Sequence, residues 1–340
     1  MTRVERIKAA LKSGEVDRLP VTMWMHHSDV DQDPRALAET QVEFVKKYDY
    51  DFIKLMPFGT YTVQDWGARI KIYCDKYMEP IVEDYAIKSI DDWKNLEVLP
   101  AVYGTWGKTL QLAQRVSAMV KNDYPFVQTI FSPLTIAAKL AGPRLFTDLE
   151  ENPDIIHDAL KIITETCINF INANIEAGVS GFFLATQNAS LKVNSSEVFK
   201  NFGKKYDMQM MNAYKDKTWF NITHIHGDNI LFDEISDYPC NCLNWHDRHT
   251  EPDFTQARKK SGKCFLGGIQ EVPYFVGKVL HYNSIMATGS AEVIEKHVHE
   301  AIAQVNGKGL ILGPGCVTDP KTSEENFKAV RRAVDTYNYR

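Results

Sequence analysis

The middle of the chain reads PFVQTIF (Pro125–Phe131), then DIIHDALKIITETCINFINANIEA (Asp154–Ala177), then GFFLA (Gly181–Ala185). The first and third stretches are short apolar runs rich in β-branched and aromatic residues, which is typical of buried strands. The second is long and amphipathic, which is typical of a helix. Strand, helix and strand in succession predict two parallel strands covered by a helix.

The same alternation continues along the whole chain. Eight runs are predicted as strands, and eight such units favour a closed (β/α)8 barrel, the TIM barrel of the α/β class. No linker rich in Pro, Gly or Ser interrupts the pattern, so residues 1–340 are predicted to form a single domain. The predicted strands are Leu19–His26, Asp51–Met56, Pro125–Phe131, Gly181–Ala185, Thr218–His224, Cys240–Trp245, Cys264–Gly268 and Gly309–Leu312.

Two stretches are additional to the eight strand–helix units of a minimal barrel. Ala68–Ile81 alternates like a hairpin, and residues 272–290 lengthen the connection after the seventh predicted strand, so this segment is a candidate lid insertion. Surface decoration is the alternative for both. The predicted helices are 1–17 at the N-terminus, Pro34–Lys47, Thr109–Lys121, Asp154–Ala177, Ser195–Tyr214, Ala291–Val305 and Ser323–Tyr337.

Bulk composition narrows the functional class. The 340 residues carry a formal net charge of -5 without long runs of one sign, which predicts no binding to nucleic acid or to a membrane surface. No apolar stretch approaches the roughly 20 residues of a membrane helix, and the charged N-terminus lacks the apolar core of a secretory signal. We therefore expect a soluble, cytoplasmic protein. Its six scattered cysteines fit reduced thiols.

The carboxyl ends of the predicted strands carry residues suited to binding a metal, and in such barrels the active site lies there. His224 and His226 are two apart, so on an extended segment both point to one side. Cys316 follows a Gly-Pro-Gly turn after the eighth predicted strand. Imidazole and thiolate are preferred zinc ligands, and three protein ligands leave one position open. We predict a metal site, with zinc as the metal, formed by His224, His226 and Cys316.

Other residues at the strand ends are candidates for catalysis and substrate binding. A lone histidine there is more often a satisfied polar residue, and a methionine more often packs in the core, so these alternatives stay open. Cys240 and Cys242 are interpreted as core residues. The candidate catalytic residues are His26, His27, Gln187 and His246. The candidate substrate-binding residues are Met25, Met56, Gln128, Asn188, Asp228 and Asn244.

The chain also resembles the uroporphyrinogen decarboxylase superfamily over nearly its whole length. The order and spacing of several motifs carry this resemblance, and no single motif does. It implies a (β/α)8 barrel with an N-terminal helical extension. The motifs are Arg18-Leu19-Pro20-Val21, Phe131-Ser132-Pro133-Leu134-Thr135, Asn244-Trp245, Gly267-Gly268-Ile269-Gln270, Leu312-Gly313-Pro314-Gly315-Cys316 and Glu325-Asn326-Phe327-Lys328-Ala329-Val330.

That superfamily contains decarboxylases and zinc-dependent methyltransferases that work with corrinoid proteins. The decarboxylases bind substrate propionates with arginines after the first strand, whereas this chain has no arginine in residues 25–29. Porphyrinogen decarboxylation is therefore disfavoured. The methyltransferases that methylate a thiol have His-x-Cys after strand five and a Pro-Gly-Cys turn after strand eight. This chain is similar at His224 and Cys316 but has His226 in place of the first cysteine.

The extra histidine changes the charge of the predicted site. Zinc held by one imidazole and two thiolates is formally neutral, whereas two imidazoles and one thiolate leave a charge of about +1. The more cationic metal is the stronger Lewis acid, which favours an ether or alcohol oxygen as the methyl carrier. Glu271, Asp228 and Asp29 are candidates for a fourth ligand that would restore neutrality.

The leading hypothesis is a zinc-dependent methyltransferase. It would move a methyl group between a small methoxylated compound, aromatic ones included, or a thiol and the corrinoid (methylcobalamin or cob(I)alamin) of a partner protein, as in anaerobic O-demethylation. The chain has no segment typical of a built-in cobalamin domain. The alternative is a metal-free decarboxylase or lyase for a small carboxylic acid, with His26, His27 and His246 as acid and base groups.

A non-enzymatic barrel that binds corrinoid or sequesters metal is a third hypothesis. Related barrels occur as monomers and as dimers, so a homodimer is compatible with the resemblance. The sequence leaves open the methyl donor or acceptor, the direction of transfer, the fourth zinc ligand and the oligomeric state.

Overall fold

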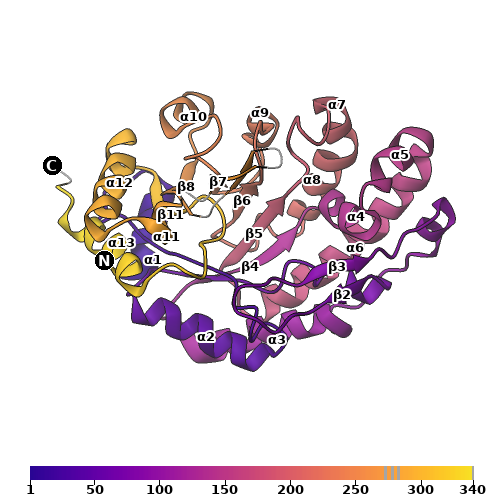
Figure 1. Ribbon diagram of the computed structural model, residues 1–340, viewed down its shortest axis with the longest axis horizontal. Helices are drawn as coiled ribbons and strands as arrows, with labels where there is room; N and C mark the ends of the chain where they lie inside the picture. Colours follow the sequence, from indigo (N-terminus) through magenta and orange to yellow (C-terminus); the bar gives the residue numbers. More distant parts are fainter. Residues whose placement is uncertain (272–273, 277–278, 282–283, 339–340) are drawn as a thin grey trace.

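The computed structural model describes residues 1–271, 274–276, 279–281 and 284–338. Its centre is a sheet of seven strands in the order β1-β4-β5-β6-β7-β8-β11, and every neighbouring pair is parallel. Figure 1 shows this curled sheet surrounded by helices. The strands are β1 (Ile53–Leu55), β4 (Phe126–Phe131), β5 (Gly181–Thr186), β6 (Ile222–Ile225), β7 (Cys242–Trp245), β8 (Cys264–Ile269) and β11 (Leu310–Pro314).

The prediction of Leu19–His26 as a strand is wrong. This segment pairs with β11 through one isolated parallel bridge, Val21 to Leu312. The backbone N–H of Val21 donates to the carboxylate of Asp51 instead of to a neighbouring strand, and Pro20 has no N–H to donate. A regular ladder therefore cannot extend along the segment. The segment still lies between β11 and β1, in the position of the eighth strand. The predicted TIM-barrel fold is therefore confirmed, with seven regular strands and this segment.

A buried carboxylate fastens that segment to the barrel. Asp51, which directly precedes β1, is fully buried. Its oxygens accept from the guanidinium of Arg6, on helix α1 (Arg3–Leu11), at 2.8 Å and from that of Arg18 at 2.6 Å. The pairs are buried and multiply hydrogen-bonded, so removing either partner leaves a costly unpaired charge. The N-terminal helix is thus joined to the amino end of the barrel.

Helices cover the outside of the sheet, and several begin at side-chain caps. The Asp33 carboxylate caps α2 and the Ser323 hydroxyl caps α13. The remaining helices after α1 are α2 (Pro34–Lys47), α3 (Gly104–Val120), α4 (Pro133–Ala141), α5 (Arg144–Glu151), α6 (Pro153–Glu176), α7 (Ser196–Val198), α8 (Lys205–Asn212), α9 (Phe232–Ile235), α10 (Phe254–Lys260), α11 (Ile285–Thr288), α12 (Ala291–Gln304) and α13 (Glu324–Thr336).

Some helix boundaries differ from those predicted. The N-terminal helix ends at Leu11 and not at residue 17, because Ser13 adopts a left-handed φ of 53°. The predicted helix Ser195–Tyr214 is divided into α7, a π-helical segment η3 (Phe199–Lys204) and α8. Two short 3₁₀ helices, η1 (Gln64–Trp66) and η2 (Ile90–Asn95), lie between β1 and α3.

Two antiparallel hairpins are added to the barrel. The predicted hairpin at Ala68–Ile81 is present as β2 (Arg69–Lys71) and β3 (Ile81–Asp84), so its second strand lies later than predicted. After β8, the strands β9 (Tyr274–Val276) and β10 (Val279–His281) pair with each other.

This second hairpin falls within the candidate lid insertion, residues 272–290, which ends with α11. Residues 272–273, 277–278 and 282–283 of the insertion lie outside the described residues. The role of the segment as a lid stays a prediction.

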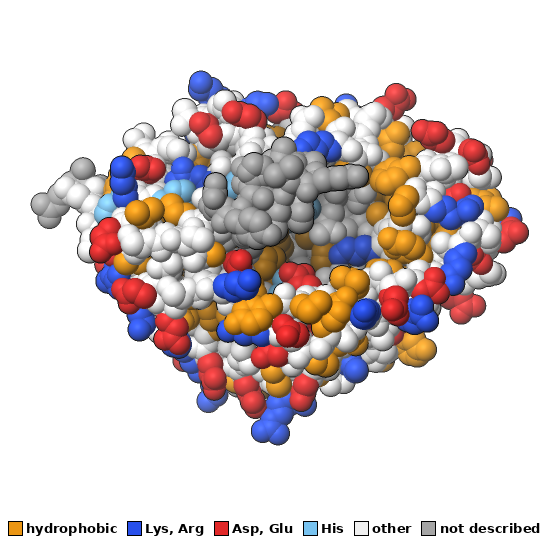
Figure 2. Space-filling model, viewed as in Figure 1, with side chains coloured by type: hydrophobic (Ala, Val, Ile, Leu, Met, Phe, Trp, Pro, Cys, Tyr) orange, Lys and Arg blue, Asp and Glu red, His pale blue; other side chains and the backbone are white. Residues whose placement is uncertain are grey.

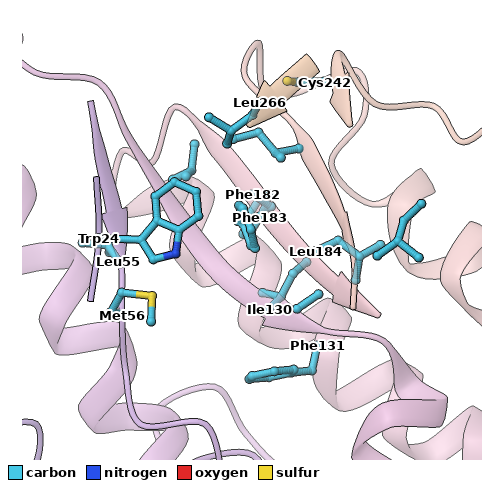
Figure 3. Packing of buried hydrophobic residues seen from close by; sticks show 14 of the residues in the cluster. Trp24, Leu55, Met56, Ile130, Phe131, Phe182, Phe183, Leu184, Cys242 and Leu266 are labelled. Carbon is cyan, nitrogen blue, oxygen red and sulfur yellow. The ribbon is translucent and has the colours of Figure 1, made fainter. Parts of the chain in front are cut away.

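Apolar side chains fill the barrel interior from its amino end. Phe52, before β1, packs edge-on against Phe220, before β6, with ring centroids 4.8 Å apart, although β1 and β6 are not neighbours in the sheet. Farther along, Trp24 meets Phe183 at 5.7 Å, as Figure 3 shows. These contacts fill the interior below the carboxyl ends of the strands, so the polar groups at those ends are left to form a site.

No described helix combines the length and the apolar character that a membrane crossing requires. On the face shown in Figure 2, acidic and basic side chains are interspersed. That mixture agrees with the small net charge and gives this face no field of a single sign.

Candidate metal centre

Four side chains converge at the carboxyl ends of β6, β7 and β11. His224 is in β6 and His226 follows its last residue, while His246 follows β7 and Cys316 follows β11. One ligand atom of each of the four lies within 4.8 Å of the others. The parallel register places His224 beside Asn244, which brings the ends of β6 and β7 level with each other. The three predicted ligands are thus brought together, and His246, predicted as a catalytic residue, joins them.

The separations of these atoms fit one tetrahedral metal ion. The Nε2 atom of His246 lies 3.2 Å from Nδ1 of His226, and Sγ of Cys316 lies 3.7 Å from the same nitrogen. With Zn–N of about 2.0–2.1 Å and Zn–S of about 2.3 Å, two nitrogens on one zinc lie about 3.3 Å apart and a nitrogen and a sulfur about 3.6 Å. The donor set and its spacing therefore fit zinc.

Asn244 fixes the ring of His224. Its side-chain NH₂ donates to the carbonyls of Leu266 and Pro314, at 2.7 and 3.1 Å, so its Oδ1 can only accept. The Nδ1–H of His224 donates to that oxygen at 2.6 Å. This leaves Nε2 of His224 with its lone pair free for a metal. Asn244, predicted to bind substrate, therefore acts on the metal ligand.

Glu271 orients the ring of His246, as Asn244 orients that of His224. Its Oε1 lies 2.8 Å from Nδ1 of His246, and the carboxylate is fully buried. A carboxylate that accepts from one ring nitrogen orients the other toward the metal and makes it a better donor. Among the described residues the fourth group that could hold a metal is thus the imidazole of His246, and Glu271 lies behind it.

Burial sets the protonation of the four groups. Burial lowers the pKa of His226 to about 3 and that of His246 to about 4, and it lowers the pKa of His224 well below its usual range. All three imidazoles are therefore neutral at pH 7, which is the form that binds metals. Burial also raises the pKa of the Cys316 thiol to about 12, so a cation is needed to hold it as a thiolate.

Two lysines lie near this cluster, because, in addition to burial, the charge of Lys54 lowers the pKa of His224 and that of Lys139 lowers the pKa of His226. His26 lies 3.2 Å from the carboxylate of Glu79, which is in the connection between β2 and β3. Burial, followed by the charges of Lys54 and Lys139, lowers the pKa of His26 to about 3. Burial likewise lowers the pKa of each lysine to about 7. His26 is therefore near both lysines.

Three other predicted residues make their own contacts outside the cluster, although Asp228 lies near enough for its charge to oppose the lowering by burial of the pKa of His226 and His246. The ring of His27 packs edge-on against Phe44 of α2, on the helix side of its segment. The carboxylate of Asp228 binds Lys192 at 2.6 Å. The carbonyl of Asn188 accepts from Asn194.

The last four predicted residues make contacts of their own that do not involve the cluster. Met56 contacts Lys54, and Met25 lines a small pocket together with Lys54 and Met56. Gln128 is fully buried, and its Nε2 donates to the carbonyl of Thr129. The backbone N–H of Gln187 donates to Thr135. These contacts leave the proposed substrate-binding roles as predictions.

Sequence reasoning missed Lys54 and Lys139. Lys54 interrupts the apolar run DFIKLM, and Lys139 interrupts the apolar helix PLTIAAKLA. A lysine inside such a run is rarely buried without a reason, so each interruption was the available signal. Glu271 was considered only as a ligand, because its contact with His246 depends on how two loops meet.

Comparisons with known proteins agree with this architecture. A family model described as uroporphyrinogen decarboxylase (URO-D) matches residues 2–337. The methylcobamide:CoM methyltransferase MtaA of Methanosarcina barkeri is 26% identical over 354 residues, covering 98% of this chain and 97% of its own.

Solved structures share the fold. A methyltransferase from Methanosarcina mazei matches with a TM-score of 0.82 at 22% identity, with 98% of each chain covered. A B12-independent methionine synthase from Shewanella sp. matches with a TM-score of 0.56 at 12% identity, covering 95% of this chain and 94% of that one. Because the family model spans almost every residue, this chain belongs to the uroporphyrinogen decarboxylase (URO-D) family.

Proposed function

We propose that this chain is a zinc-dependent methyltransferase that moves a methyl group between a small molecule and the corrinoid of a partner protein. The observation that carries the proposal is the convergence of three imidazoles and one thiol at the barrel mouth. The similarity over full length to a methylcobamide:CoM methyltransferase supports the corrinoid as the other methyl carrier.

The donor set favours a methyl group bound to oxygen. Zinc held by three neutral imidazoles and one thiolate would carry a charge of about +1, and this Lewis acidity would stabilise the oxygen anion left when an ether loses its methyl group. Adding His246 to the predicted ligands leaves that charge unchanged, because the imidazole is neutral. It also fills the position that three ligands leave open, so the substrate oxygen would bind as a fifth ligand or in place of His246. We therefore favour demethylation of a methoxylated compound over methylation of a thiol.

The protein's own groups hold the site in place for this reaction. Asn244 and Glu271 fix two imidazoles in the tautomer that presents Nε2 to the centre. Preorganised donors of this kind need not be reordered during the reaction, which is where much catalytic stabilisation arises. The apolar walls formed by Trp24 and Phe183 limit water next to the cluster.

A spectroscopic assay with free corrinoids tests the proposal. Zinc-loaded protein is mixed anaerobically with cob(I)alamin and 4-methoxybenzoate, or with methylcobalamin and a thiol, and the corrinoid spectrum is recorded. We expect the corrinoid to be either methylated by the ether or demethylated by the thiol, with about one equivalent of zinc per chain. Cys316→Ser should abolish it, while Cys74→Ser, at an exposed cysteine, should not. Full activity after chelation, with less than about half an equivalent of zinc, would falsify the proposal.

The metal-free lyase has less support from the geometry. Its proposed acid and base groups were His26, His27 and His246, but His27 packs against α2 and His246 belongs to the cluster. It would regain support if His224→Ala left the folded protein able to decarboxylate a small acid.

A further inference from the structure

The ammonium group of Lys54 is buried beside aromatic rings. Lys54 is on β1 and only 6% exposed. Its Nζ lies 2.6 Å from the thioether sulfur of Met56, a weak acceptor, and 4.3 Å from the ring centroid of Phe183. Within the described part of the chain Lys54 forms no ion pair. Two of its three N–H groups thus lack a hydrogen-bond acceptor there.

Lys139 is half-buried and also lies against an aromatic ring. It projects from α4, and its Nζ lies 3.7 Å above the ring centroid of Phe131 and donates to the carbonyl of Gly59 at 2.5 Å. It too forms no ion pair with any residue that the structure describes. Besides this carbonyl and ring, the carboxylate of Glu79 acts on the charge of Lys139 from beyond ion-pair distance.

The two lysines lie along one wall of the barrel interior. Lys54 is over Phe183 of β5, which is paired with Thr129 of β4, and Lys139 is over Phe131, two residues farther along β4. Two residues of a strand rise about 6 to 7 Å, toward the carboxyl end. The ammonium groups therefore follow one another along the wall toward the barrel mouth.

This wall adjoins the metal cluster. The ring of Phe183 stacks on His224 with centroids 5.4 Å apart, and Lys54 lies 4.3 Å from that same Phe183 ring. The two distances together place Nζ of Lys54 within about 10 Å of the His224 ring. This upper limit admits a small molecule with one aromatic ring between its two ends, or a shorter one.

Among the described residues neither ammonium group has an anion within ion-pair distance, although the Glu79 carboxylate acts on Lys139 and the Cys316 sulfur acts on Lys54 from farther away. A substrate that enters beside the buried Lys54 and the half-buried Lys139 would therefore bind better with a negative charge. Burying a charge is unfavourable unless the charge is paired, and an arriving carboxylate or sulfonate would pair it with charge-assisted hydrogen bonds. A neutral ligand would leave both charges as they are.

We propose that Lys54 and Lys139 bind the anionic group, a carboxylate or a sulfonate, of the small molecule whose methyl group this enzyme transfers. The methyl-bearing atom then lies at the other end of the molecule, facing the cluster of His224, His226, His246 and Cys316. The inference rests on the proposed function, because it takes the cluster as the place of methyl transfer.

Calorimetric titration of the zinc-loaded protein tests the inference without any corrinoid. The probes are two pairs that differ in charge: 4-methoxybenzoate against 4-methoxybenzamide, and 2-mercaptoethanesulfonate against 2-mercaptoethanol. We expect the anion of at least one pair to bind at least about tenfold more tightly than its neutral counterpart, as charge-assisted bonds predict. The pair that shows the difference identifies the carboxylate or the sulfonate as the natural group.

Lysine-to-methionine variants assign the effect to the two residues. Lys54→Met and Lys139→Met keep most of the apolar volume and remove the charge. Each should weaken binding of the anion by about tenfold and change binding of the neutral probe less than about twofold. Lys161→Met, at an exposed lysine of α6, removes the same charge from the surface and should change neither.

Equal affinity of the wild type for anion and neutral probe would overturn the inference. So would an anion preference that survives in both the Lys54 and the Lys139 variant. Either result leaves the proposed function intact if methyl transfer still occurs. Conversely, anion preference that depends on Lys54, together with a corrinoid spectrum that never changes, would contradict the proposed function alone.

Discussion

At the residue scale, Asn244 shows how the site depends on groups that are not among the proposed metal ligands. Its amide accepts from His224 and is itself fixed by two backbone carbonyls. We predict that Asn244→Ala lowers zinc affinity by about 10- to 100-fold, because the imidazole loses its fixed orientation. Competition with a chromophoric chelator measures this change. Asn172→Ala on the surface of α6 is the control, and equal affinities in the two variants would contradict the prediction.

Lys54 should make folding stability depend on pH. Burial lowers its pKa from 10.5 to about 7 in the folded protein, while the unfolded chain keeps the ordinary value. Between these pH values the unfolded chain binds more protons, so stability rises with pH across this range. Below pH 7 the unfavourable burial of the charge is fully present.

We therefore predict that Lys54→Met is more stable than the wild type by about 1 to 4 kcal/mol at pH 6.5, and that the difference shrinks as the pH approaches 10. Urea unfolding of both proteins at several pH values measures it. Because other titrating groups are common to both chains, they cancel in the difference. A difference that stays constant with pH would show that Lys54 keeps its ordinary pKa.

Site residues could be predicted where a short sequence motif marks them, and they were missed where their role depends on a contact between distant parts of the chain. His224 and His226 share a face because they are two apart, and Cys316 follows a turn, so each was visible in one short motif. The role of Glu271 depends on a contact with His246, twenty-five residues away, that no periodicity encodes. Lys54 was visible only as an exception to an apolar run, and exceptions have several causes.

At the scale of elements, α3 begins without a cap of its own. The side chain of Tyr103, at the N-cap position, makes no hydrogen bond to the helix, and the carboxylate of Asp65 takes its place from η1. Asp65 accepts from the backbone N–H groups of Thr105 at 2.7 Å and Trp106 at 3.2 Å. Gly104 is required beside it, since a Cβ there would lie 2.0 Å from an Asp65 oxygen.

We predict that Asp65→Ala destabilises the fold by about 1 to 2 kcal/mol, because two helix N–H groups lose their acceptor and the helix dipole loses an anion. Asp65→Asn should lose less, since the amide oxygen still accepts. The denaturation midpoint of each variant measures the effect. Asp158→Ala, which removes an exposed carboxylate from α6, should stay within about 0.5 kcal/mol of the wild type.

Strand positions were predictable where burial requires an apolar run, and this held for seven of the strands. The strand prediction failed at Leu19–His26. Strand pairing is limited there because Pro20 has no N–H to donate and the N–H of Val21 donates to the carboxylate of Asp51. Helices α4 and α5 were not predicted, since Pro133 and Pro143 open short helices that the eightfold pattern does not require.

At the scale of the whole molecule, the barrel is closed by different means at its two ends. At the amino end Asp51 joins β1 to Arg6 and Arg18, and Phe52 meets Phe220 across the interior. At the carboxyl end β6 and β7 pair as neighbours, Asn244 of β7 donates to the last residue of β11, and side chains from all three strand ends converge on the proposed metal. A bound ion would thus connect segments from residues 224 to 316.

Zinc should therefore stabilise the folded chain by mass action. A ligand that binds only the native state contributes RT ln(1 + [L]/Kd), about 2.7 kcal/mol at one hundred times Kd. We predict that removing zinc with a chelator lowers the free energy of unfolding by about 2 to 3 kcal/mol under such conditions, and that adding zinc back restores it. Urea unfolding at fixed free zinc, set with a metal buffer, measures the change. His224→Ala supplies the contrast, because without this ligand the unfolding curve should no longer respond to zinc, whereas Asn172→Ala should respond like the wild type. An equal response in the His224 variant would mean that zinc stabilises the chain from somewhere other than this cluster.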